Sequence, residues 1–120
     1  MRTAKIIVRN DDEAVIENAA RGFINAWNDP DSNEDIFTFS SPSQLFTVLT
    51  PKRWALIEQL QKSGPLTYRA LASLLERDVK RVHEDASALI EWGLVASHEN
   101  GGIYVPYSLI HAGFDLKAAA

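Results

Sequence analysis

The chain contains no cysteine among its 120 residues. This absence excludes disulfide bonds, thiolate zinc sites and cysteine nucleophiles together, and it is compatible with a reducing compartment. The first ten residues lack the long apolar region of a signal peptide. No stretch approaches the ~20 apolar residues needed to span a bilayer. We therefore expect a cytoplasmic protein with no membrane partner.

Sequence signatures of catalysis and of metal binding are also missing. His83, His98 and His111 are far apart in the sequence, and none is paired with a carboxylate at the spacing of a helical metal motif. No serine stands in a nucleophile-elbow pattern. Gly101 and Gly102 fall at a predicted hairpin tip and do not precede a helix, so they do not form a phosphate-binding loop. We expect no enzyme, no metal and no cofactor.

Basic charge is scarce, since the formal net charge is -4. This balance argues at first against nucleic acid, because the phosphate backbone attracts basic surfaces. The acidic excess lies in one half of the chain, however. Residues 1–50 contain four Lys and Arg against eight Asp and Glu, whereas residues 51–120 contain eight of each. If the chain binds DNA, we expect the second half to bind it through a local patch.

The first 49 residues predict a strand, a helix, a second strand and a short helix. Residues 4–9 are a β-rich run. In residues 11–28, apolar side chains recur at spacings of four, three and four, which predicts one apolar helical face. Residues 36–40 read as a strand, and Ser41 followed by Pro42 is typical of a helix start.

The rest of the chain predicts three helices, a hairpin and a last strand. The helices are expected at residues 51–62 after the cap-and-proline start Thr50-Pro51, from the N-cap Thr67 to about residue 75, and from the N-cap Asp78 to residue 92 with Gly93 as the stop. The first of them is expected to bury Trp54, Leu56, Ile57 and Leu60. Asn100-Gly101 joins the strand-like residues 94–97 and 103–105 and is a strong hairpin signal. Alternation in residues 110–116 predicts the last strand, followed by a frayed tail.

Three short helices followed by a two-stranded wing are the order of elements in a winged helix-turn-helix. We therefore predict an α+β fold with an N-terminal strand-helix-strand extension (residues 1–49), a winged helix-turn-helix DNA-binding domain (50–107) and a C-terminal strand and tail (108–120). The extension either pairs with the C-terminal strand as a dimer platform or completes the monomer core. We favour a homodimer, because helix-turn-helix proteins usually need two half-sites.

The predicted helix at residues 79–92 is the candidate recognition helix. The spacing of Val82, Ala86 and Leu89 turns them inward and turns the candidate DNA contacts outward. These candidates are Lys80, Arg81, His83, Glu84 and Ser87. Lys and Arg donate to guanine or phosphate, and Glu accepts from cytosine. The alternative interpretation is an ordinary solvated helix face with local ion pairs.

Two further groups are candidate DNA contacts. Thr67, Tyr68 and Arg69 begin the preceding helix and are expected to hold the phosphate backbone, because helix N-termini attract anions. His98 and Asn100 lie at the tip of the wing. His98 either reaches a phosphate or lies in water.

Asp85 is expected on the inner edge of the recognition helix. A charge is costly there unless it is paired. We expect its carboxylate to hold Arg81, one turn earlier, or to cap a neighbouring element, and not to contact a base.

Four stretches of the second half carry a family resemblance. They are residues 49–65, residues 77–85 with the run Arg-Asp-Val-Lys-Arg-Val-His, residues 91–95 with Gly-Leu-Val, and residues 105–107. In them the chain resembles a family of short MarR-like predicted transcriptional regulators of bacteria and archaea, often considered antitoxins. The likeness covers the whole length and is strongest from Leu49 onward. The Gly-Leu-Val entry to the wing occurs in many winged-helix families, whereas the longer run is more particular.

The resemblance implies dimeric DNA binding, autoregulation and neutralisation of a partner toxin. The wing tip departs from better-known MarR regulators, because it offers His98, Glu99 and Asn100 in place of several arginines. This difference argues against insertion of the wing into the minor groove. A second hypothesis is a protein-interaction module, in which the C-terminal strand or the acidic half binds and silences a toxin.

Overall fold

The computed structural model describes residues 2–9, 34–116 and 118. They form an α+β fold that divides into two compact units. The helix-hairpin unit is Phe46–Ser108, and the strand unit is Arg2–Leu45 with Leu109–Ala120. The predicted helix at residues 11–28 lies outside the described residues. No helix in the described part of the chain has the length and apolar content that crossing a bilayer requires.

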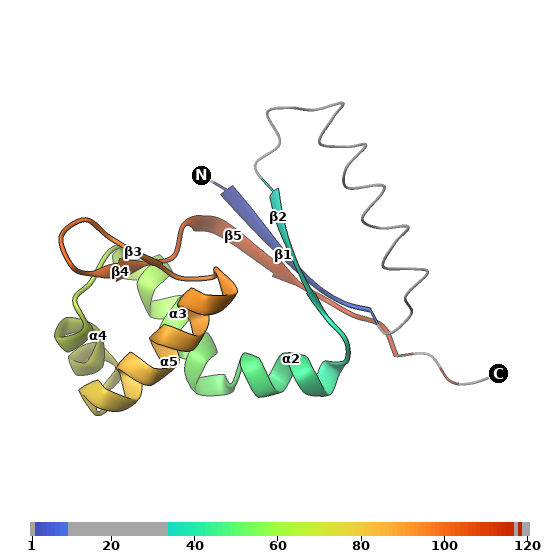
Figure 1. The fold of residues 1–120 in the computed structure, drawn as a ribbon, viewed down its shortest axis with the longest axis horizontal. Coiled ribbons are helices and arrows are strands. Elements are labelled where there is room, and N and C mark those ends of the chain that lie inside the picture. The colour runs from blue at the N-terminus through green and yellow to red at the C-terminus, as the bar shows by residue number, and fades with distance from the viewer. Residues whose placement is uncertain (1, 10–33, 117, 119–120) are drawn as a thin grey trace. The chain divides into compact units, whose positions relative to one another are not determined.

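Three helices build most of the helix-hairpin unit (Figure 1). Each begins after a residue whose side-chain oxygen accepts a hydrogen bond from the backbone N–H three residues later, which satisfies a donor that the first helical turn leaves free. The helices and their N-caps are α3 (Pro51–Ser63, Thr50), α4 (Tyr68–Leu75, Thr67) and α5 (Val79–Trp92, Asp78). These caps and bounds confirm the predicted helices to within one residue.

Left-handed backbone ends α4 and α5. Gly93 follows α5 at φ 93°, where glycine is favoured because it carries no Cβ. Glu76 follows α4 at φ 55° and is the one non-glycine residue of the described chain with positive φ. The backbone N–H of Arg77 donates to the carbonyl of Ala72 at 3.0 Å and closes the turn. As a result, Glu76, Arg77 and Asp78 are sufficient to connect α4 to α5.

The core of this unit is apolar side chains from all three helices. Those less than 2% exposed include Leu56, Ile57, Leu60, Leu71, Ala72, Val82, Ala86 and Leu89. The predicted core of α3 is confirmed except at Trp54, which is only half-buried. Trp54 lies two positions before Leu56, outside the stripe that Leu56, Ile57 and Leu60 form at helical spacing.

The predicted hairpin is present but short. Strands β3 (Ala96–Ser97) and β4 (Ile103–Tyr104) pair antiparallel. At the tip Gly101 has φ 85°, and the backbone N–H of His98 donates to the carbonyl of Gly102 at 2.7 Å. The chain entering α4 also joins this sheet, because Leu66 and Ile103 exchange two backbone hydrogen bonds of 3.0 and 2.8 Å.

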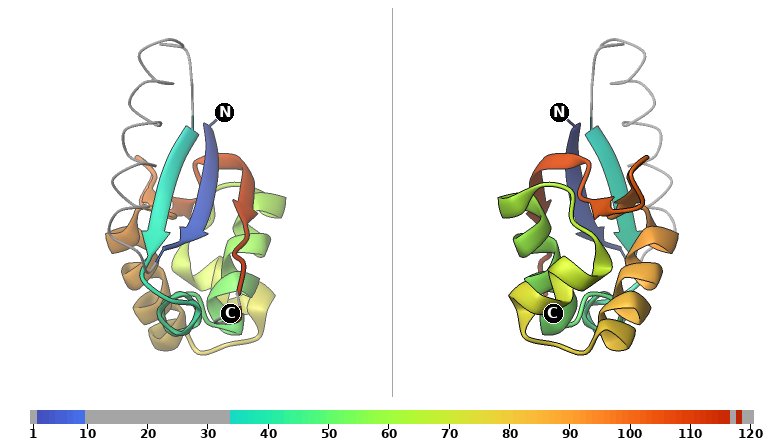
Figure 2. Two further views of the ribbon diagram at one scale, coloured as in Figure 1. Left: turned by 90° about the vertical axis from the view of Figure 1, so that its right-hand side faces the viewer. Right: turned by 90° about the vertical axis from the view of Figure 1, so that its left-hand side faces the viewer.

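The strand unit contains most of a sheet in the order β2-β1-β5, whose arrows point the same way in Figures 1 and 2, and the first two residues of β5 fall in the helix-hairpin unit. The strands are β1 (Arg2–Val8), β2 (Glu34–Phe39) and β5 (Tyr107–Ala112). Parallel pairing places Ile6 beside Phe37. Helix α2 (Pro42–Val48) follows β2, and its first turn is capped because the Gln44 N–H donates to the Ser41 hydroxyl at 3.0 Å.

The last strand differs from its prediction of residues 110–116. It begins at Tyr107 and ends at Ala112, and the N–H of Gly113 donates to the Ile6 carbonyl at 3.3 Å. Because β1 ends at Val8, little strand remains for later residues to pair with. The alternation that predicted the strand continues into Phe114 and Leu116, which are 38% and 79% exposed.

Candidate functional site

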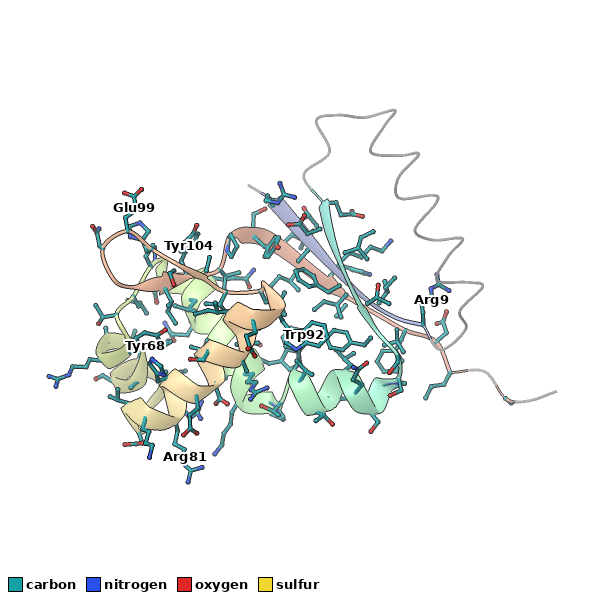
Figure 3. All side chains as sticks on the ribbon, in the orientation of Figure 1. Arg9, Tyr68, Arg81, Trp92, Glu99 and Tyr104 are labelled. Carbon is teal, nitrogen blue, oxygen red and sulfur yellow. The ribbon has the colours of Figure 1, made fainter. Side chains whose placement is uncertain are left out.

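The predicted orientation of α5 is confirmed. Val82, Ala86 and Leu89 are completely buried. Among the candidate contacts on the other side of the helix, Lys80, Arg81, His83 and Glu84 are exposed and Ser87 is half-buried. Figure 3 shows Arg81 projecting outward from the first part of α5. The helix therefore presents a polar face along its N-terminal two turns.

The start of α4 contacts this face through an aromatic pair. The Tyr68 ring lies 4.6 Å from the His83 ring, centroid to centroid, at an interplanar angle of 40°. Nδ1 of His83 is 3.4 Å from the hydroxyl of Ser87, one turn further along α5. Tyr68, His83 and Ser87 thus form one connected group across two helices.

Thr67 and Arg69, the neighbours of Tyr68 in the sequence, do not contact the polar face of α5 in the same way. The hydroxyl of Thr67 accepts a hydrogen bond from the Ala70 N–H at 3.1 Å, so it positions the first turn of α4. Arg69 is exposed. In the described part of the chain, none of Arg69, Lys80 and Arg81 forms an ion pair. The local ion pairs of the alternative interpretation are therefore absent among these residues, whereas the solvated helix face that it also describes fits their exposure.

The hairpin tip is a separate group. His98 is half-buried, its ring meets Tyr104 edge-on at 5.8 Å, and its Nδ1 accepts the Asn100 N–H at 3.3 Å. Glu99 and Asn100 are exposed, and Figure 3 shows Glu99 pointing outward. Among the described residues, no hydrogen bond, ion pair or ring contact connects this tip to the candidates on α4 and α5.

Asp85 is paired, as expected, but with neither of the two predicted kinds of partner, Arg81 or the end of a neighbouring element. Its carboxylate binds Arg53 of α3 at 3.1 Å and Arg77 of the α4-α5 turn at 2.7 Å. Arg53 also donates to the Val48 carbonyl at 2.7 Å. The prediction considered a partner one turn away on the same helix. The inner edge of α5 instead faces α3 and the α4-α5 turn, and these elements carry the two arginines.

The two arginines determine how Asp85 titrates. Partial burial alone would raise the pKa of the Asp85 carboxyl. Hydrogen bonds from Arg77 and Arg53, together with their positive charges, outweigh burial and hold this pKa below its ordinary value. Asp85 is therefore a carboxylate at neutral pH and joins α3, the turn and α5.

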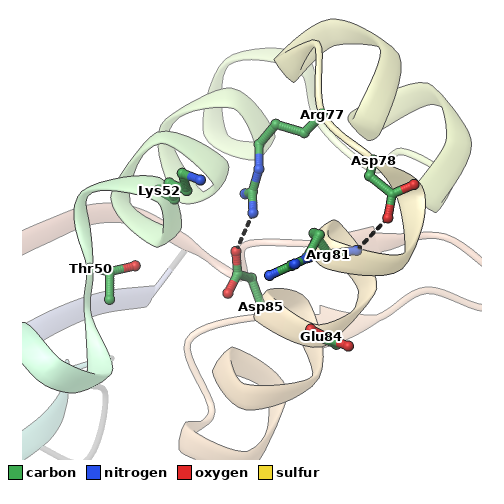
Figure 4. A pocket seen from close by; sticks show the side chains of 7 residues that line it. All are labelled: Thr50, Lys52, Arg77, Asp78, Arg81, Glu84 and Asp85. Atoms are coloured by element: carbon green, nitrogen blue, oxygen red, sulfur yellow. Dashed lines mark hydrogen bonds and ion pairs between the residues drawn. The ribbon is translucent and has the colours of Figure 1, made fainter.

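A polar hollow of about 490 Å³ opens beside this ion-pair cluster (Figure 4). Its lining residues come from the start of α3, the α4-α5 turn and the start of α5, and they are Thr50, Lys52, Arg77, Asp78, Arg81, Glu84 and Asp85. Arg81 and Glu84 were predicted as site residues, whereas Lys52 and Arg77 were not. The N-caps Thr50 and Asp78 were predicted from the sequence. That both line the same hollow depends on how α3 and α5 pack.

Among the described residues, no group of three His, Cys, Asp or Glu side chains is placed to hold a metal ion. The hollow is lined by charged side chains of both signs and by the hydroxyl of Thr50.

Comparison with known proteins concerns the same region. A family model described as HVO_A0114 matches residues 48–112. No curated protein and no solved structure matches the chain. The resemblance to MarR-like regulators and antitoxins stays a prediction. Because the match spans more than half of the chain, including α3, α4, α5 and the hairpin, the chain belongs to the HVO_A0114 family.

Proposed function

We propose that this protein is a sequence-specific DNA-binding transcriptional regulator of the winged helix-turn-helix type, acting in the cytoplasm as a homodimer. In this proposal α4 and α5 are the helix-turn-helix, β3 and β4 are the wing, and α5 lies in the major groove. The resemblance to MarR-like regulators adds repression and autoregulation to the proposal. No catalytic step is assigned.

The observation that carries the proposal is the exposed face at the start of α5. Lys80 and Arg81 are exposed there without an ion-pair partner among the described residues, while the opposite face of the helix is completely buried. A buried inner face fixes the helix on its core, and long donors near its N-terminus are the groups that reach base edges in a major groove.

The flanking groups fit backbone contacts. Arg69 stands exposed in the first turn of α4, and the ring of Tyr68 leans on His83 of α5. Donors at a helix N-terminus hold phosphates and set the register of the protein on the duplex. The wing contributes less, because Glu99 at its tip repels phosphate.

The first experiment is a titration of a labelled fragment carrying the protein's own promoter, with and without competitor DNA, at two salt concentrations. We expect promoter-specific binding that weakens as salt rises, because cations on the protein replace counterions on the phosphates. Absence of specific binding at low salt would overturn the proposal.

Substitutions on α5 localise the contact. Arg81→Ala should cost roughly 1 to 3 kcal/mol of affinity for the promoter fragment. Lys80→Ala should weaken binding as well, whereas Lys62→Ala, which removes an exposed charge from the last turn of α3, should not. Equal losses for Lys80→Ala and Lys62→Ala would show a general charge effect and argue against groove entry by α5.

A second candidate function is binding of a protein partner such as a toxin. Leu109 in β5, the strand at one edge of the sheet, is 58% exposed, and β5 carries no Lys, Arg, Asp or Glu. Unprotected edge strands are typical sites for pairing with another chain. Co-purification with the product of the neighbouring gene, lost in Leu109→Asp, would support this function. Binding unchanged by that substitution would argue against β5 as the contact.

A further inference from the structure

The hollow beside Asp85 is lined by three cationic and three acidic side chains, and Arg53, which is not part of the lining, adds a fourth cation through its ion pair with Asp85. Its floor is a single carboxylate, Asp85, held between the guanidinium groups of Arg53 and Arg77. Nη1 of Arg77 is buried, and no described residue accepts a hydrogen bond from it. One carboxylate is therefore paired with two guanidinium groups, and this cluster has one positive charge in excess.

The rest of the lining adds two cations and two carboxylates. Lys52 on α3 and Arg81 on α5 line the hollow from different elements, and both are exposed (Figure 4). The carboxylate of Asp78 accepts the backbone N–H of Arg81 at 3.3 Å and keeps its negative charge. Glu84 is the acidic group of the lining that has no such engagement among the described residues. With Arg53 counted, four cations stand against three carboxylates, which leaves an excess of one positive charge.

Two helices begin at the hollow. Thr50 caps α3 and Asp78 caps α5, and both residues line it. The N-terminus of a helix carries a partial positive charge of about half a unit. At α5 the carboxylate of Asp78 offsets this partial charge, so the start of α3, which the neutral Thr50 caps, is the helix end that adds to the side-chain cations.

We infer that this hollow holds a phosphate group. Its oxygens can accept from the Lys52 ammonium and the Arg81 guanidinium together, because the two groups lie on different walls of one space. A volume of about 490 Å³ leaves room for a phosphate that is part of a larger molecule. The source is either the DNA backbone, in which case the inference rests on the proposed function, or a free phosphate-bearing molecule, in which case it does not.

The test has two arms and uses the full-length protein. In the first, inorganic phosphate is titrated at constant ionic strength against chloride while backbone amide NMR signals are followed. We expect saturable shifts at residues 50–53 and 78–81. Lys52→Gln should weaken this binding about tenfold, since it removes a charge-assisted hydrogen bond. Lys62→Gln, at the other end of α3, should leave it unchanged, and Glu84→Gln should strengthen it.

In the second arm, the salt dependence of promoter binding is compared for the same variants. Loss of one phosphate contact in Lys52→Gln should reduce the slope of log K against log salt by about 0.9. A reduced slope assigns the phosphate to the DNA backbone. Phosphate binding with an unchanged slope, or with no DNA binding at all, assigns it to a free molecule. If phosphate shifts no signals at these helix starts and the slope does not change, the inference is wrong.

Discussion

The two units of this chain are assembled by different kinds of contact. In the helix-hairpin unit each helix starts at its own cap, and α3, α4 and α5 follow one another through short turns. In the strand unit the sheet joins β1 to β2 from Glu34 onward and to β5 from Tyr107 onward. Local contacts form with little loss of chain entropy, whereas parallel pairing must first close long loops.

The halves of the chain also differ in charge. Residues 1–50 carry the whole excess of acidic side chains, and residues 51–120 are balanced. Within the balanced half, ion pairing occupies Arg53 and Arg77 and leaves Lys80 and Arg81 exposed. The negative net charge argues against nucleic acid, but the exposed cations of the second half include Lys80 and Arg81 at the start of α5 and Arg69 at the start of α4. The comparison therefore associates the proposed DNA contact with the helix-hairpin unit.

The largest contrast should come from leucines of the two units. Leu89 is completely buried in α5, and Leu109 in β5 is 58% exposed. Leu89→Ala should lower the free energy of unfolding by about 3 kcal/mol, because it removes buried methyl groups and leaves a cavity. Leu109→Ala should cost less than about 0.5 kcal/mol. Urea denaturation measures both, and a loss above 2 kcal/mol for Leu109→Ala would show that a partner, such as a second copy, buries β5 in solution.

Paired carboxylates give the next contrast. Asp85→Asn should lower the free energy of unfolding by about 2 kcal/mol, because it leaves Arg53 and Arg77 without their shared anion in a cluster whose side chains are about 20% exposed. Asp35 pairs with Arg2 in the strand unit, where these side chains are 35% and 47% exposed. Asp35→Asn should therefore cost less, about 0.5 kcal/mol.

The Asp85→Asn variant also gives a test of pH dependence when it is compared with the wild type. The pKa of Asp85 is lower in the folded protein than its ordinary value, so the folded state binds this proton less readily than the unfolded state. The stabilisation from Asp85 is complete above the ordinary aspartate pKa of about 3.9 and is lost as pH falls through the lower, folded pKa. The difference in stability between the wild type and Asp85→Asn should shrink below about pH 4. A constant difference down to pH 2 would show that packing, and not charge, causes the effect.

Glycines provide a smaller contrast. A Cβ at Gly102 would lie 2.8 Å from the Leu66 carbonyl oxygen, whereas one at Gly113 in the strand unit would meet a His111 side-chain atom at 3.7 Å. Gly102→Ala should cost about 1.5 kcal/mol, because it forces apart the backbone pairing of Leu66 with Ile103. Gly113→Ala should be within about 0.5 kcal/mol of the wild type. Thermal unfolding of the two variants checks this, and equal losses would contradict the close approach at Gly102.

Sequence reasoning predicted the parts that local chemistry decides. The caps Thr50, Thr67 and Asp78 and the buried stripe of α5 were readable because a side-chain oxygen or an apolar spacing acts within one or two turns. Residue order also indicated the hairpin through Asn100-Gly101, and Gly101 has the positive φ that this turn requires.

Contacts between distant segments were not predictable in the same way. Asp85 was expected to need a partner, but Arg53 and Arg77 are brought to it by helix packing. The end of β5 depends on where β1 ends, which no pattern within residues 110–116 contains. The hollow at Lys52 required the starts of α3 and α5 to converge. Each of these features joins segments that are more than 20 residues apart or belong to different elements. For such segments, the spacing along the sequence does not predict the distance in space.

The smallest effect should be one in which the two units behave alike. Thr67 caps α4 and Ser41 caps α2, with hydroxyl-to-amide distances of 3.1 and 3.0 Å. Thr67→Ala and Ser41→Ala should each lower the free energy of unfolding by about 1 kcal/mol, because each leaves one backbone donor of a first turn unsatisfied. Thr67→Ser should retain the wild-type stability in urea denaturation, since it keeps the accepting oxygen. A loss of stability for Thr67→Ala but none for Ser41→Ala would mean that the effect of a cap also depends on the unit. The contrast between local and distant contacts would then no longer explain why the structure of one half of the chain is predictable from its sequence.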